Sequence, residues 1–159
     1  MTPWWHPEQV AKRRPFLDVR RAAVKAVRAF FQAEGFLEVD TPALQVSGGV
    51  ERHIRQFRTH LTEPFGQGRQ ELFLHTSPEF AMKKLLAGGL GKIAQTTRVY
   101  RDGERGPLHH PEFTMTEWYR AGLDYESMMS DAATLVQKIA RAAQRTLKHD
   151  GYLHWQGRS

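Results

Sequence analysis

The side chains that could do chemistry gather between Lys92 and Arg120. Three arginines, Arg98, Arg101 and Arg105, lie toward one end of this stretch, and Glu117 lies toward the other. Burying an unpaired carboxylate is costly, so Glu117 needs a cation supplied either by the fold or by a ligand. An acid deep in a pocket with arginines near its mouth suits a ligand that has an ammonium at one end and a phosphate at the other.

The residues around these side chains predict a long β-hairpin. Ile93–Arg101 and Phe113–Tyr119 are rich in β-branched and aromatic residues, whereas Asp102–Pro111 carries Gly, Pro, Asp and His. Because alternate residues of a strand point to opposite faces, one face of the second strand carries Phe113, Met115, Glu117 and Tyr119. The other face carries Glu112, Thr114, Thr116 and Trp118. One face therefore combines an aromatic ring, a thioether, a carboxylate and a phenol.

A helix and a short strand are expected before the hairpin. Residues 1–15 are predicted to form an extended arm with a short helical turn near Glu8–Arg13. From Phe16 to Glu34, apolar residues recur at helical spacing, at Leu17, Val24, Val27 and Phe31. Gly35 can supply the positive φ that ends such a helix. The pattern then alternates over Phe36–Val39, and Pro42 indicates an edge strand or an interface.

The middle of the chain predicts one further helix. Gln45–Arg69 is uninformative: residues 47–49 and 64–66 resemble turns, and Ile54–Leu61 fits a strand with Ile54, Gln56, Arg58 and His60 on one side. Glu71–His75 predicts a short strand, and Thr76–Glu79 has the residue types of a helix start. We expect the helix to run to Ala87, with Met82, Leu85 and Leu86 inward. Glu79 can then be a capping-box acid with no other role.

The region after the hairpin predicts a second long helix. Asp124 is a suitable N-cap for a helix that continues to Leu147. Its apolar stripe comprises Met128, Ala132, Leu135, Val136, Ile139 and Ala143. In the tail, Asp150–Gly151 predicts a turn and Tyr152–Trp155 the start of a strand.

Composition sets broad limits on class and compartment. The 159 residues suit one domain, 1–159, and 40% hydrophobic with 25% charged residues is ordinary for a globular protein. The formal charge of +6 favours acidic partners or reflects a generally basic surface. The chain has no cysteine, which excludes disulfides and thiolate sites. No apolar run suggests a membrane helix or signal peptide, so the cytoplasm is expected. His109–His110 lacks the spacing of a metal site, so no metal-ligating residues are predicted.

Three stretches resemble the class II aminoacyl-tRNA synthetases of the lysyl type. Arg98–Arg120, with its run HHPEFTMTEWYRAG, resembles motif 2 of that family. Phe30–Leu44, FFQAEGFLEVDTPAL, resembles motif 1, and Leu72–Gln95 resembles the segment that binds the amino acid. The resemblance covers Leu17–Tyr125 and is strongest to the short paralogues that attach β-lysine to elongation factor P. It implies an α+β fold, with a partial antiparallel sheet flanked by the two long helices, and a homodimer formed through motif 1.

The resemblance also implies a reaction and a site. Such enzymes use ATP and Mg²⁺ to convert lysine or β-lysine to an aminoacyl-adenylate, and here would transfer it to a lysine of elongation factor P. Arg101 matches the catalytic arginine that meets the α-phosphate; its alternative role is a surface pair with Asp102 or Glu104. The ATP site would comprise Arg101, Asp102, Gly103, Glu104, His110 and Phe113. The amino acid site would comprise Ser77, Pro78, Glu79, Glu117 and Tyr119. Phe113 would stack on adenine or simply pack in the core.

The chain departs from the family pattern in three places. Gly103 stands where the family has an acid, so either Glu104 reaches the nucleotide or that contact is lost. His110 stands where an asparagine is common. Motif 3 is absent, which suggests a fragment or a truncated paralogue, and a half sheet predicts poor solubility or a tight dimer.

Two other functions stay open. One is a lysyl-tRNA synthetase core with tRNA-Lys as its partner, although only a short segment precedes the first predicted helix, where an anticodon-binding domain would lie. The other is a non-catalytic dimer that binds nucleotide or RNA.

Overall fold

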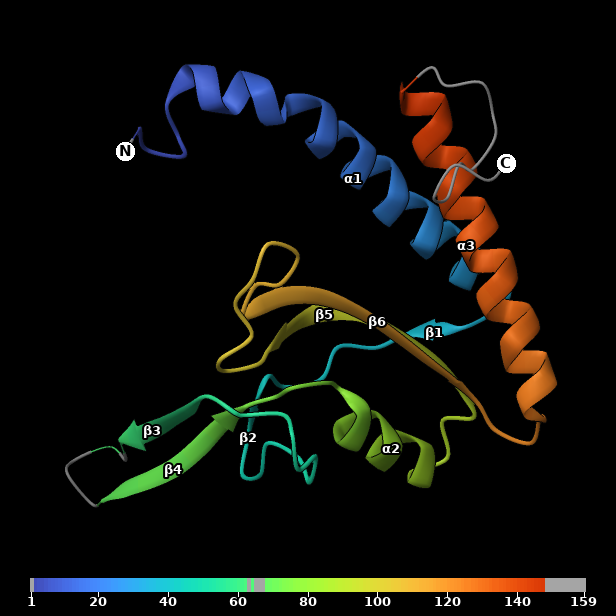
Figure 1. Ribbon diagram of the computed structural model, residues 1–159. Helices are drawn as coiled ribbons and strands as arrows, with labels where there is room; N and C mark the ends of the chain where they lie inside the picture. Colours follow the sequence, from blue (N-terminus) through green and yellow to red (C-terminus); the bar gives the residue numbers. More distant parts are fainter. Residues whose placement is uncertain (1, 63, 65–67, 148–159) are drawn as a thin grey trace. The chain divides into compact units, whose positions relative to one another are not determined.

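The computed structural model describes residues 2–62, 64 and 68–147, which form three helices and two small sheets (Figure 1). The described chain divides into two compact units. One comprises the chain up to Gly35 and from Leu123 onward, and the other runs from Phe36 to Gly122. The single domain predicted for 1–159 stays a prediction. The turn predicted at 64–66 and the predictions for 150–155 lie wholly or partly outside the described residues.

The first unit contains α1 (Pro7–Ala33), which begins earlier than expected. The helical turn predicted near Glu8–Arg13 is confirmed as part of α1, whereas the extended conformation predicted for the rest of 1–15 is wrong from residue 7 onward. Pro7 lies in the first turn, where its missing N–H costs nothing, and Lys12 forms an ion pair with Glu8 at 2.8 Å. The helix ends as predicted, because Gly35 takes φ 73°.

The second helix of this unit, α3 (Tyr125–Leu147), packs against α1 (Figure 1). The predicted N-cap is confirmed, since the Ser127 backbone N–H donates to Asp124 Oδ1 at 3.0 Å and its hydroxyl donates at 2.7 Å. The buried apolar side chains of the pair are Val27, Phe30, Phe31 and Leu135. Leu17 and Val136 belong to the apolar patterns read from the sequence, yet they are exposed, at 53% and 59%.

The second unit contains the predicted hairpin. Its sheet has the order β1–β5–β6, formed by β1 (Leu37–Glu38), β5 (Lys92–Tyr100) and β6 (Glu112–Arg120). The β5–β6 pair is antiparallel, but β1 pairs with β5 in parallel, so the sheet is mixed and not purely antiparallel as predicted. A long connection separates β1 from β5, as parallel neighbours require. That the long helices flank this sheet stays a prediction.

A second sheet, not predicted as such, has the order β2–β4–β3. Its strands are β2 (Leu44–Gln45), β3 (Arg58–Thr62) and β4 (Arg69–Leu74). The strand expected from Ile54 therefore begins only at Arg58. The helix α2 (Glu79–Ala87) follows β4 with the predicted bounds, and Met82 is fully buried.

The core of this unit consists of Phe36, Leu72, Met82, Ile93, Ala94 and Val99. Among the described residues, no helix has the length and apolar character needed to cross a membrane.

Candidate functional site

The start of α2 places two of the predicted side chains. Ser77 Oγ accepts a hydrogen bond from the Glu79 backbone N–H at 3.1 Å, which fixes the first turn of the helix. The Glu79 carboxylate makes an ion pair with Lys83, one turn later, and no side chain caps the helix at Pro78. Glu79 therefore does not act as the capping-box acid that the sequence allowed.

The β5–β6 register places Glu117 beside the start of α2. The Tyr119 hydroxyl donates to Glu117 Oε2 at 3.2 Å, and Ser77 also forms a side-chain hydrogen bond with Glu117. Burial raises the pKa of Glu117 above its usual 4.5, because desolvation outweighs these two hydrogen bonds, and the nearby Glu79 charge raises it further. Burial and the Glu117 charge also raise the pKa of Tyr119. Glu117 is thus a carboxylate whose ionised form would gain from a cation.

Arg101 is held by three contacts just beyond the end of β5. Its guanidinium lies over the Phe113 ring at 5.1 Å from the centroid, and its Nε donates to the Thr76 carbonyl at 3.4 Å. Arg101 Nη1 lies 3.5 Å from Glu104 Oε1. The alternative pairing with Glu104 is therefore present, and Phe113 contacts the arginine through its ring.

A pocket of about 160 Å³ brings these elements together. Its polar lining includes Ser77, Glu79, Arg101 and Glu117, and its apolar lining includes Ile54, Phe80 and Met115. Glu79 and Glu117 lie on the same pocket, and the guanidinium of Arg101 contributes to its wall. With Glu51, the pocket thus offers three carboxylates and one cation to a ligand.

Other predicted site residues do not line this pocket. Pro78 is fully buried, and Tyr119 is linked to the pocket through Glu117. The Asp102 backbone N–H donates to the Arg55 carbonyl, and Gly103 takes φ 79°. His110 contacts the backbone of Glu112, with Nδ1 at 2.9 Å from the carbonyl oxygen. The predicted nucleotide-binding roles stay predictions for Asp102, Gly103, Glu104, His110 and Phe113. The amino-acid-binding roles of Pro78 and Tyr119 stay predictions too.

The loop before β3 also contributes to the pocket, through Gly49, Glu51 and Ile54, and the sequence did not predict this. The backbone at Gly48 approaches Gln56 closely, because a Cβ added there would lie 2.5 Å from Gln56 Cδ and the Gln56 side chain would have to shift. Gln56 in turn donates to the Gly49 carbonyl at 2.9 Å. The two neighbouring glycines were the only sequence signal of this close approach.

Two buried polar side chains beside Glu117 were also missed. Gln95 is the register partner of Glu117, and its Oε1 accepts a hydrogen bond from Thr41 Oγ1 at 2.9 Å. His75 Nε2 lies 2.6 Å from the Arg98 carbonyl, so that nitrogen carries the proton. Gln95 Nε2 and His75 Nδ1 have no hydrogen-bond partner within the described chain. The sequence signal was a polar residue, Gln95, on the face that also carries Ile93 and Val99.

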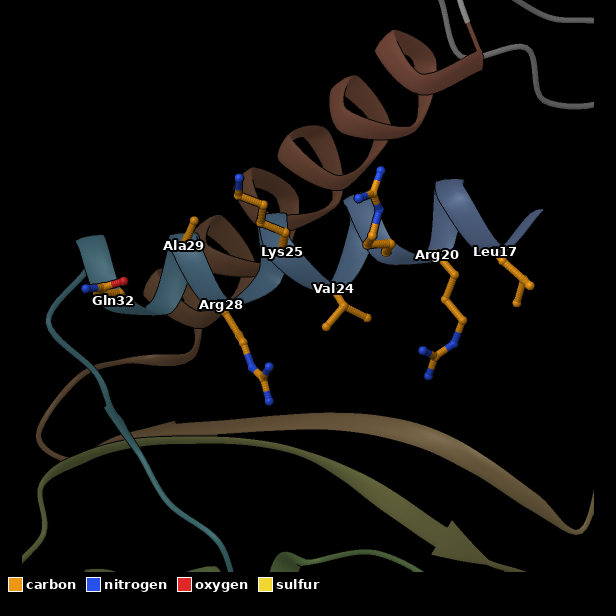
Figure 2. Close-up of a pocket in the computed structure, with 8 residues that line it drawn as sticks. Leu17, Arg20, Val24, Lys25, Arg28, Ala29 and Gln32 are labelled. Carbon is orange, nitrogen blue, oxygen red and sulfur yellow. The ribbon is translucent and has the colours of Figure 1, made fainter. Parts of the chain in front are cut away.

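The hollow drawn in Figure 2 is a different feature. All the side chains that line it, including Leu17, Val24 and Arg28, come from α1. A single helix face cannot surround a ligand, so we do not assign the active site there. Within the described chain, no group of three His, Cys, Asp or Glu side chains could hold a metal ion.

Comparison with known proteins adds an independent observation. The family model described as tRNA synthetases class II (D, K and N) matches residues 9–153. The elongation factor P–(R)-β-lysine ligase of Mannheimia succiniciproducens is 41% identical over 135 residues, which cover 85% of this chain and 41% of that protein. The ligase of the same name from Vibrio parahaemolyticus is 37% identical over 151 residues, covering 94% of this chain and 46% of that protein. The chain spans less than half the length of these relatives.

Proposed function

The chain belongs to the class II tRNA synthetases (D, K and N), and we propose that it supplies the lysine pocket of a ligase that acts on elongation factor P. The relatives it resembles are named as ligases of that factor. The observation that carries the proposal is the convergence of Glu79, Glu117 and Arg101 on one pocket.

Two of the pocket's carboxylates, Glu79 and Glu117, suit the amine groups of lysine or β-lysine. Glu117 is partly desolvated, and the charge of Glu79 contributes to its raised pKa. An ammonium group placed between them would relieve both the desolvation cost and the mutual repulsion. A neutral amino acid of the same length would offer no such gain, so the pocket favours a substrate with an amine at its far end.

Arg101 suits the phosphate end of the reaction. In the proposed first step, a carboxylate oxygen of the amino acid attacks the α-phosphorus of ATP, and pyrophosphate leaves. In the second step, the amine of an acceptor lysine attacks the acyl carbon, and AMP leaves. A planar guanidinium can hold the α-phosphate while the two anions approach each other. Arg101 would have to exchange its contact with Glu104, at 3.5 Å, for the phosphate.

Mg²⁺ is not placed by the described residues, since they contain no cluster of three metal-ligating side chains. The proposal therefore assigns no step to the metal. The chemistry assigned to this chain is binding the amine, holding the α-phosphate and orienting the attacking carboxylate.

One observation supports a second candidate acceptor besides elongation factor P. The matching family model is named for tRNA synthetases, so tRNA-Lys is the second candidate. The pocket residues would do the same chemistry in either case, because both acceptors follow the same activation step.

The first test is lysine-dependent exchange between ATP and pyrophosphate, in a chain extended to the length of its relatives. Removing one charge-assisted contact costs about 1.5–3 kcal/mol, so E79A and E117A should each raise the KM for lysine roughly ten- to a hundredfold. R101A should lower kcat instead. E71A is the matched control, because Glu71 is a surface acid paired with Arg58 at 3.6 Å and does not line the pocket.

Unchanged KM for lysine in both E79A and E117A would remove the assigned pocket. Absence of exchange in the extended chain would favour a non-catalytic binding protein. If exchange occurs, transfer of labelled lysine to purified elongation factor P or to tRNA-Lys decides the acceptor.

A further inference from the structure

A second cavity lies between the two long helices of the helical unit. It has a volume of about 360 Å³ and is lined by Ala26, Ala29 and Phe30 of α1 and by Lys138, Arg141, Ala142 and Arg145 of α3. We call this cavity the α1–α3 groove. None of its lining residues belongs to the lysine pocket.

The charges along the groove have one sign. Lys138, Arg141 and Arg145 are spaced three and four residues apart on α3, so they follow one face of the helix over about 10 Å. No carboxylate lines the groove among the described residues. Like charges at this spacing repel one another, and an anion in the groove would relieve that repulsion.

The floor of the groove is apolar. It consists of Ala26, Ala29 and Ala142, and the buried ring of Phe30 lies among them. Small side chains keep this floor low, which leaves room for apolar side chains of another molecule. The groove therefore combines a shallow apolar floor with a cationic wall.

Lys25 extends the positive charge on the α1 side. Ala29 lines both the α1–α3 groove and the α1 face in Figure 2. Figure 2 shows Lys25 and Ala29 pointing to the same side of α1, whereas Arg28 points to the opposite side. Lys25 is thus positioned to add a fourth cation beside the groove.

We propose that the α1–α3 groove docks an acidic amphipathic helix of a partner protein. An apolar stripe on that helix would lie on the alanine floor, and its flanking Glu or Asp side chains would meet Lys138, Arg141 and Arg145. RNA fits less well, because a phosphate backbone gains little from an alanine floor and the groove presents no exposed ring on which a base could stack.

This proposal does not depend on the ligase function. The groove is formed by the helical unit, and the lysine pocket by residues between Phe36 and Gly122. A variant that abolishes binding in the groove can therefore still be assayed for the ligase reaction, and a variant of the lysine pocket can still be assayed for peptide binding.

The test is fluorescence anisotropy with a labelled synthetic peptide about five helical turns long, with Leu on one face and Glu on both flanks. Three other probes are compared with it: a scrambled peptide of the same composition, polyglutamate and an RNA duplex. The protein variants are K138Q/R141Q, which removes two groove cations, and R69Q/K84Q, which removes two exposed cations of the other unit. Far-UV circular dichroism verifies that each variant keeps its helices.

We expect K138Q/R141Q to weaken binding of the amphipathic peptide about tenfold or more, and R69Q/K84Q less than about twofold. A29E is a second variant, which adds a negative charge to the floor, and it should weaken binding in the same way. Equal binding of the scrambled peptide, equal loss in R69Q/K84Q, or tighter binding of the RNA duplex would each overturn the proposal.

Discussion

The hydrogen bond between Thr41 and Gln95 connects the segment after β1 to the strand that pairs with Glu117. Thr41 Oγ1 donates to Gln95 Oε1 at 2.9 Å, and the two residues are 8% and 2% exposed. Gln95 Nε2 has no hydrogen-bond partner within the described chain. T41V keeps the shape of the side chain but removes the donor, so it would leave both polar atoms of the Gln95 amide unpaired.

The expected loss of stability in T41V follows from the free-energy cost of leaving a buried polar group without a hydrogen bond. Leaving one such group without a partner costs about 1–3 kcal/mol, whereas replacing both partners by apolar groups of similar shape is nearly neutral. T41V should therefore lower the free energy of unfolding by about 1–3 kcal/mol. T41S keeps the hydroxyl and should lose less.

The assay is urea unfolding of T41V, Q95M and the double variant. With a slope of about 1–3 kcal/mol per molar urea, T41V should lower the transition midpoint by roughly 1 M. The double variant should be no less stable than T41V alone, which corresponds to a coupling of about 1 kcal/mol or more. Equal stability of T41V and T41S, or additive effects of the two single changes, would refute the reasoning.

Two further predictions concern single carboxylates. Because burial raises the pKa of Glu117, its contribution to stability is present below pH 4.5 and is lost as the pH rises through the raised pKa. The stability of E117Q relative to the unchanged protein should therefore increase between acidic pH and neutrality, as measured by urea unfolding at each pH; a constant difference would contradict this. Hydrogen bonds from Ser127 lower the pKa of Asp124, so its contribution is present above pH 3.8 and is lost as the pH falls through the lowered pKa. D124A should lower the thermal midpoint of α3 unfolding at neutral pH and D124S should largely restore it; equal midpoints for D124A and D124S would show that the cap does not matter.

Some features of this protein could be read from the sequence because they depend on neighbouring residues. The bounds of α2, the hairpin β5–β6, the Asp124 cap and the Gly35 helix end follow from alternation, capping and backbone freedom over a few positions. The faces of β6 follow in the same way. Glu117 and Tyr119 had to share a side, and their hydrogen bond at 3.2 Å agrees with that.

The same local rules failed near the N-terminus, where prolines were read as ending helical structure although the helix continues through them. Pro3, Pro7 and Pro15 suggested an extended arm, yet α1 begins at Pro7 and includes Pro15. Proline is tolerated in the first turn, and the residues between Pro7 and Pro15 are strong helix formers. The parallel pairing of β1 with β5 likewise depends on partners far apart in the chain.

The sequence by itself determined which residues carry charge and which local elements hold them: an acid at the start of α2, another on β6 and an arginine just beyond β5. Only the tertiary structure decided that Glu79, Arg101 and Glu117 surround one pocket, that Gln95 lies buried opposite Glu117, and that cations of α3 line a groove with α1. The physical reason is that residue types and periodicity act over a few positions, whereas convergence depends on strand register and helix packing between segments far apart in the chain.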